Sequence, residues 1–248
     1  MPKYDFRMPR LYVDAPLAGG NAVSLNRDQG HYLANVLRLP PGGELLLFNG
    51  RDGEWRARLA GGKKALTVEV GERSRAQPPV GDLHFLFAPL KHARLDYLVQ
   101  KAVEMGASRI APVLTRFTQV TRVNLERMRA NVIEAAQQCG VLNVPEVGEP
   151  LDFAALVGGW DARRLLVFCD EDAVVKDPVA ALAAVRAAAS ISVLIGPEGG
   201  FAAEERDVLL KQAHVVRLAL GPRILRADTA AVAALALVQA VLGDWRGA

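Results

Sequence analysis

Two glycine- and proline-bearing segments near the C-terminus carry residue types suited to binding a small ligand. The first, GPEGGF at 196–201, follows the apolar run ISVLI and precedes a helical pattern that begins near Ala202. Its glycines let a ligand approach the backbone, and its proline stiffens the segment. It lacks the lysine and hydroxyl of a P-loop, and Glu198 would repel phosphate. The segment predicts a site for a neutral or cationic group, unless it is only a tight connection.

The second segment, LGPRILRADTA at 220–230, joins the run VVRL to the last helical pattern. Arg223 and Arg226 lie beside a Gly-Pro turn, where two cations suit phosphate or a developing negative charge. Solvated surface arginines are the alternative interpretation. Asp228 or Thr229 is expected to cap the last helix.

The remaining polar residues argue against metal or covalent chemistry. The segment CDED at 169–172 could bind a ribose hydroxyl or an amino group, or form only a turn or a helix cap. There is no GxSxG elbow, and Cys169 lies in an apolar run, where thiols are usually inert. No metal site is expected, because HExxH and paired spacing are absent among His31, His84, His92 and His214.

Short apolar runs alternate with helical patterns after residue 82, and these elements must position the two segments. Continuously apolar strands between helices predict an α/β fold with a parallel sheet covered on both faces. Ligands of such sheets bind beyond the carboxyl ends of the strands, so the two segments are expected to lie side by side and form a crevice. Strands are expected at 83–88, 109–114, 164–169, 191–195 and 215–218, with a helix at 94–105 that ends at Gly106.

The first part of the chain has a different pattern. Between Glu44 and Val70, apolar and polar residues alternate, which predicts half-buried antiparallel strands and a small β-barrel. Asp28 is expected to cap a short helix, HYLANVLR, whose apolar face would be formed by Leu33, Val36 and Leu37.

Length and charge agree with two soluble domains. The 248 residues are 51% hydrophobic and 23% charged, as in globular proteins, and QPPVGD at 77–82 is typical of a linker. Residues 1–130 carry a net charge of +8 and residues 131–248 a net charge of −5. The basic part favours a polyanionic partner, unless it is only a solvated surface. Neither a membrane span nor an export signal is recognisable, so a cytoplasmic location is expected.

The two segments closely resemble the signature segments of the bacterial 16S ribosomal RNA uridine-N3 methyltransferases, which belong to the SPOUT superfamily. The resemblance covers almost the whole chain, with further matches in MPRLYV at 8–13, HYLANVLRL at 31–39 and LDYLVQKAVEMGASRIAPV at 95–113. The chain departs from the family pattern in a few places. Gln137 and Val141 stand where the family commonly has Glu and Arg, and Ala-Asp-Thr at 227–229 replaces Thr-Glu-Thr.

The resemblance implies a PUA-like β-barrel for RNA at 1–77 and a SPOUT methyltransferase domain with a C-terminal trefoil knot at 78–248. It also implies a homodimer through the C-terminal domain and 16S ribosomal RNA, or the 30S subunit, as partner. The implied cofactor is S-adenosylmethionine. Its expected contacts are Leu194, Ile195, Gly196, Pro197, Glu198, Gly199, Gly200, Leu218, Leu220, Gly221, Ile224 and Leu225.

Methylation of N3 of a uridine requires loss of the N3 proton, and so a base or a cation that stabilises the imide anion. Arg226 is the expected cation and Asp228 the expected base. Arg10, Arg38 and Arg223 are expected to contact RNA. The alternative is a noncatalytic RNA-binding ribosome-assembly factor, which would not bind S-adenosylmethionine. A nucleotide-dependent enzyme is disfavoured because the P-loop lysine is missing.

Overall fold

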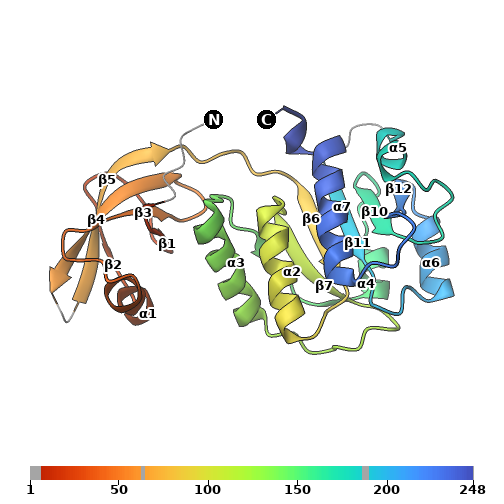
Figure 1. Ribbon diagram of the computed structural model, residues 1–248, viewed down its shortest axis with the longest axis horizontal. Helices are drawn as coiled ribbons and strands as arrows, with labels where there is room; N and C mark the ends of the chain where they lie inside the picture. Colours follow the sequence, from red (N-terminus) through yellow and green to blue (C-terminus); the bar gives the residue numbers. More distant parts are fainter. Residues whose placement is uncertain (1–6, 63–64, 186–189, 248) are drawn as a thin grey trace. The chain divides into compact units, whose positions relative to one another are not determined.

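The computed structural model describes residues 7–62, 65–185 and 190–247 (Figure 1). The chain forms two compact units. The first contains the described residues of Met1–Val80 together with Ile133–Val144, and the second those of Gly81–Val132 and Pro145–Ala248. The domain limits expected from the sequence, 1–77 and 78–248, remain a prediction.

Hydrogen bonds explain why Ile133–Val144, which includes the end of helix α3 (Leu125–Cys139), belongs to the first unit. The backbone N–H of Tyr12 donates to Oε1 of Gln137 at 2.8 Å. Arg75 donates from Nη2 to the carbonyl of Gly140 at 3.0 Å. Gln137, one of the departures from the family pattern, therefore has a structural partner.

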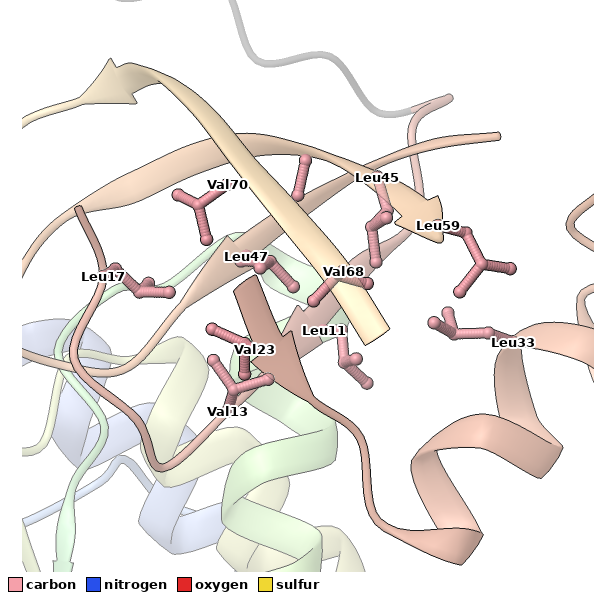
Figure 2. Packing of buried hydrophobic residues seen from close by; sticks show 11 residues of the cluster. Leu11, Val13, Leu17, Val23, Leu33, Leu45, Leu47, Leu59, Val68 and Val70 are labelled. Atoms are coloured by element: carbon pink, nitrogen blue, oxygen red, sulfur yellow. The ribbon is translucent and has the colours of Figure 1, made fainter. Parts of the chain in front are cut away.

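The first unit contains a five-stranded sheet with the order β1-β3-β4-β5-β2. Strand β1 pairs parallel with β3, and the other neighbours are antiparallel. The expected small barrel is present as a half-barrel, and Figure 2 shows the apolar side chains packed inside it, among them Leu33, Leu47 and Val68. The strands are β1 (Arg10–Tyr12), β2 (Ala22–Ser24), β3 (Glu44–Phe48), β4 (Glu54–Gly62) and β5 (Ala65–Arg75).

The short helix of the first unit differs from the prediction. Helix α1 (Arg27–His31) is capped by Asn26, not Asp28, because Asn26 Oδ1 accepts a hydrogen bond from the backbone N–H of Gln29 at 2.8 Å. It continues as a π-helical turn, η1 (Tyr32–Val36). Leu33 is buried, but Val36 is 59% exposed and Leu37 39% exposed. The predicted common face is wrong, since a π turn holds more residues than an α turn and rotates the side chains that follow.

The second unit is built on a parallel sheet with the order β12-β10-β11-β6-β7-β8, while β9 pairs with β7. Every pair in the described sheet is parallel, which confirms the expected α/β architecture. The strands are β6 (Leu83–Phe87), β7 (Arg109–Leu114), β8 (Glu146–Val147), β9 (Leu151–Asp152), β10 (Leu165–Cys169), β11 (Ile191–Ile195) and β12 (Val215–Leu218).

Helices pack on this sheet. Leu156 of α4 and Leu209 of α6 join one buried cluster with strand residues such as Leu194. Helices α2 and α7 pack against each other, and α7 contacts β11 (Figure 1). No helix in the described ranges is long and apolar enough to cross a membrane. The helices are α2 (His92–Glu104), α4 (Phe153–Gly158), α5 (Pro178–Ala183), α6 (Ala203–Leu210), α7 (Ala227–Val241) and the 3-10 turn η2 (Asp244–Gly247).

Candidate functional site

The loops after β10, β11 and β12 meet at one edge of the parallel sheet. Strand β10 lies between the other two, with Phe168 in register with Leu194 and Cys169 in register with Leu218. The strands therefore end level, and β11 and β12 are separated by two strand spacings, or about 10 Å. The loops 196–201 and 219–226 therefore begin at the same edge of the sheet, while the crevice expected between them stays a prediction. The loop that begins at Asp170 lies between them.

The loop 196–201 has a fixed shape. The N–H of Gly200 donates to the carbonyl of Pro197 at 2.9 Å, and Gly200 has φ 72°, a conformation that favours glycine. The ring of Phe201 covers Gly196 so closely that a Cβ at Gly196 would stand 2.9 Å from Cε2 of that ring. Phe201 in turn packs edge-on against buried Phe168, with ring centroids 6.0 Å apart. Gly196 is therefore required by packing.

Asp170 joins the three elements that carry the loops. Its side chain is 5% exposed and accepts hydrogen bonds from Nε of Arg217 on β12 at 2.7 Å and Nε of Arg206 on α6 at 3.2 Å. Burial raises the pKa of Asp170, but the bonds from Arg217 and Arg206 outweigh this effect, and the pKa lies below its usual value. Asp170 is thus a structural anion, a role that the sequence analysis missed. Its only signal is the charge of Arg217 within the apolar run VVRL.

Cys169 and Glu171, which flank Asp170 in the sequence, do not share its ion pairs. Burial raises the pKa of the Cys169 thiol to about 12, and the charges of Glu171 and Asp170 add to this effect. The thiol is therefore protonated at neutral pH, which agrees with its predicted inertness. Glu171 is exposed and faces the glycine-rich loop, since a Cβ at Gly200 would stand 3.8 Å from its Oε1. Among the described residues, no group of three or more His, Cys, Asp or Glu side chains could hold a metal ion.

The loop 219–226 has an open surface. Gly221 has φ 91°, and no described atom lies within 4 Å of the position that a Cβ would take there. The side chain of Ile224 is fully exposed, and Arg223 and Arg226 are exposed as well. Leu218, at the end of β12, is fully buried.

Helix α7 begins at this loop, but not as predicted. Arg226 is the N-cap residue, with an extended backbone and no side-chain capping bond, and its carbonyl accepts from the N–H of Ala230 at 2.8 Å. Asp228 lies within the first turn, where its carboxylate accepts from the N–H of Thr229 at 2.9 Å. The predicted caps at Asp228 or Thr229 are wrong, because the helix starts before either residue. The structure thus brings the side chains of Arg226 and Asp228 to one helix terminus.

Arg10 and Arg38, both expected to contact RNA, lie in very different environments. Arg10 is 7% exposed, and its Nε donates to Oε1 of Glu54 at 3.0 Å. Arg75 donates to the same oxygen at 2.6 Å. Burial raises the pKa of Glu54, but the hydrogen bonds and charge of Arg75, with Arg10, lower it overall. This placement argues against a contact between Arg10 and RNA phosphate. Arg38 is exposed, and its φ of 52° makes it the one described non-glycine residue with positive φ.

Two family models match the chain. The model described as RNA methyltransferase domain matches residues 76–239, and the model described as RNA methyltransferase PUA domain matches residues 25–71. The parallel sheet with its loop site lies within the first region, and strands β3 and β4 and most of β5 of the half-barrel lie within the second. The chain belongs to the RNA methyltransferase family.

Similar proteins carry a more specific name. Ribosomal RNA small subunit methyltransferase E from Rickettsia conorii is 31% identical over 93% of this chain and 94% of its own length. The protein of that name from Synechocystis is 33% identical over 89% of this chain and 73% of its own length.

Solved structures with bound cofactor share the fold. Ribosomal RNA small subunit methyltransferase E from Neisseria gonorrhoeae, bound to S-adenosyl methionine, has a TM-score of 0.87 at 28% identity, over 96% of this chain and 100% of that chain. A putative methyltransferase from Legionella pneumophila, in complex with the same cofactor, has a TM-score of 0.80 at 28% identity, over 96% of this chain and 99% of that chain.

Proposed function

We propose that this protein methylates N3 of a specific uridine in 16S ribosomal RNA, using S-adenosylmethionine. The observation that carries the proposal is the convergence of the loops after β10, β11 and β12 at one edge of the sheet. Membership of the RNA methyltransferase family and the similarity to cofactor-bound structures support the same chemistry.

The residues at this edge fit S-adenosylmethionine. Glu171 and Glu198 are exposed carboxylates at the glycine-rich loop, so they favour a ligand with an amino group and a sulfonium and disfavour a polyphosphate. Open backbone at Gly221 and the exposed side chain of Ile224 offer polar and apolar contacts to a nucleoside. When bound, the cofactor supplies an electrophilic methyl group. We expect its contacts at Leu194, Ile195, Gly196, Pro197, Glu198, Gly199, Gly200, Leu218, Leu220, Gly221, Ile224 and Leu225.

The start of α7 supplies the groups that act on the uridine. The Asp228 carboxylate accepts the N3 proton, and the Arg226 guanidinium stabilises the imide anion that remains. Arg226 is the last residue of the loop 219–226, and Asp228 follows it in the first turn of α7, so a cofactor bound by this loop would lie near both. The site also holds the two reactants in line, and such positioning can contribute roughly 7 to 11 kcal/mol.

RNA binding uses exposed cations of both units. Arg38 of the first unit and Arg223 of the second contact phosphate, whereas Arg10 acts through the stability of the half-barrel. The substrate is 16S ribosomal RNA, free or in the 30S subunit, in the cytoplasm. Neutralising phosphates releases counterions, so affinity should fall as salt concentration rises, and a flat salt response would contradict this assignment.

The proposal also includes a homodimer and a knotted second domain, both of which the family resemblance implies. Helix α7 is apolar on nearly all sides, and Val232 and Leu237 are only half-buried within one chain. This partly exposed apolar surface of α7 is where we expect a second copy to pack. Sedimentation of the purified protein tests the dimer.

Mapping of methylated uridines in ribosomal RNA, from cells with and without this protein, tests the reaction. We expect one N3-methyluridine to disappear when the protein is absent and to remain lost when only Arg226→Ala is supplied. Unchanged methylation by Arg226→Ala would remove the role of the cation. Calorimetry with S-adenosylmethionine separates the enzyme from a noncatalytic assembly factor, which would have no affinity for the cofactor.

A further inference from the structure

Phe117 is an exposed aromatic residue beside the candidate site. It lies in the loop after β7 and is 46% exposed. A Cβ at Gly199 would stand 3.4 Å from Cβ of Phe117 and 3.8 Å from its Cγ, so the aromatic side chain adjoins the glycine-rich loop. This loop faces solvent at Glu198 and Gly199. An accessible apolar ring therefore borders the glycine-rich loop of the candidate site.

The loop that carries Phe117 is rigidly held. The backbone N–H of Thr115 donates to Oγ1 of Thr118 at 2.9 Å, and the N–H of Thr118 donates to the carbonyl of Thr115 at 3.1 Å. These reciprocal bonds close a turn, with Arg116 and Phe117 at its exposed centre. The ring is thus presented outward by the backbone, and its exposure is a defined feature of the turn.

Glu205 ties this turn to the glycine-rich loop. Its Oε1 accepts from the backbone N–H of Arg116 at 2.8 Å, and its Oε2 accepts from the N–H of Ala202, directly after GPEGGF, at 3.0 Å. One carboxylate therefore links the turn after β7 to the start of α6, directly after the glycine-rich loop. These two bonds therefore fix the turn that carries Phe117 against the C-terminal end of the glycine-rich loop.

We propose that Phe117 is a base-stacking residue that binds the face of the target uracil beside the glycine-rich loop. This inference rests on the proposed function. N3 lies on the Watson–Crick edge of uracil, so the base must be unpaired and turned out of its stack before it can react. Proteins commonly hold such unstacked bases against aromatic side chains, and any base can stack on a ring.

Charge favours RNA over a second protein surface at this position. Arg116 is exposed next to Phe117 in the turn, and Arg94 also lies at the glycine-rich loop, with Nη1 3.8 Å from Oε1 of Glu198. Aromatic side chains among cations are typical of single-stranded nucleic acid binding, in which phosphate and base are held together. An interface between copies of this chain is the competing occupant, and the experiment below distinguishes it.

The test compares variants of the full-length protein for RNA methylation, RNA affinity and cofactor affinity. Phe117→Ala should raise KM for RNA about 5- to 150-fold, which corresponds to about 1 to 3 kcal/mol per stacked base. Phe117→Leu retains apolar bulk but no aromatic face and should lose nearly as much, whereas Phe117→Tyr should retain wild-type KM. The dissociation constant of S-adenosylmethionine should stay unchanged. Tyr97→Ala is a matched control, because Tyr97 is 43% exposed on α2.

Each outcome decides one question. If Phe117→Leu methylates with wild-type KM, the stacking role is refuted while the proposed function stands. A wild-type protein without methylation or cofactor binding refutes the proposed function; the stacking role is then decided by direct affinity for a uridine-containing single strand. Conversion of an oligomer to a monomer by Phe117→Ala, with unchanged RNA affinity of each chain, would assign the ring to an interface and overturn the proposal.

Discussion

Arg217 on β12 donates from Nε to the carboxylate of Asp170, at the end of β10, at 2.7 Å. The bond links two neighbouring strands where their loops begin, and Arg206 extends it to α6. Breaking a mostly buried ion pair strongly destabilises the fold, because one charge is left buried without its partner. The pair therefore holds together the points where the loops after β10 and β12 begin.

Asp170→Asn should destabilise the second unit and weaken cofactor binding. The amide can accept only some of the bonds that the carboxylate accepts. It leaves Arg217 without this counter-charge and Arg206 with only the more distant carboxylate of Asp172, at 4.0 Å. We expect a loss of about 2 to 4 kcal/mol in the free energy of unfolding, since both arginines are partly exposed. Chemical denaturation measures the loss. Wild-type stability of Asp170→Asn would show that the pair contributes nothing.

The difference between wild type and Asp170→Asn should depend on pH. Because the folded pKa of Asp170 is lowered, its stabilisation is fully present above the unfolded pKa of about 3.9 and is lost as pH falls through the folded pKa. The gap in unfolding free energy should therefore be constant from about pH 7 to pH 5 and narrow below about pH 4. Denaturation of both proteins across this range checks the sign. A gap that widens in acid would contradict it.

Gly196→Ala should damage the glycine-rich loop. The new Cβ would stand 2.9 Å from the ring of Phe201, which packs on Phe168 and cannot move freely. Overpacking of this kind costs about 1 to 3 kcal/mol, and the displaced loop should bind S-adenosylmethionine more weakly. Calorimetry and thermal denaturation measure the two effects. Gly81→Ala is the control: no described atom lies within 4 Å of its Cβ position, so stability should change by less than about 0.5 kcal/mol.

Arg10→Ala and Arg38→Ala should separate stability from RNA binding. Removal of buried Arg10 leaves Glu54 with fewer partners and should cost about 3 kcal/mol in unfolding free energy. Arg38 is exposed, so its removal should leave stability within about 0.5 kcal/mol while the salt dependence of RNA binding becomes shallower. Equal thermal stability of the two variants would refute this division of roles.

Local patterns predicted the elements of this protein well and their ends less well. The apolar runs at 83–88 and 191–195 became β6 and β11, since continuous apolar strands need cover on both faces. The helix caps predicted at Asp28 and at Asp228 or Thr229 were wrong, because several polar residues lie within one turn of each helix start and the sequence does not show which of them is the cap. The π turn after His31 has no pattern of its own, and so the exposure of Val36 was not foreseen.

The amino-acid sequence alone determined the parallel sheet, the strands of a small β-barrel and the two loop segments of the candidate site, because periodicity and turn residues act over short distances. Tertiary structure decided what contact between distant segments must create: the burial of Arg10 against Glu54, the Asp170 ion pairs, and the link through Glu205 that places Phe117 beside the glycine-rich loop. A charged or aromatic side chain has the same appearance in a sequence whether it is buried or exposed. Its role depends on the partners that chain folding brings to it.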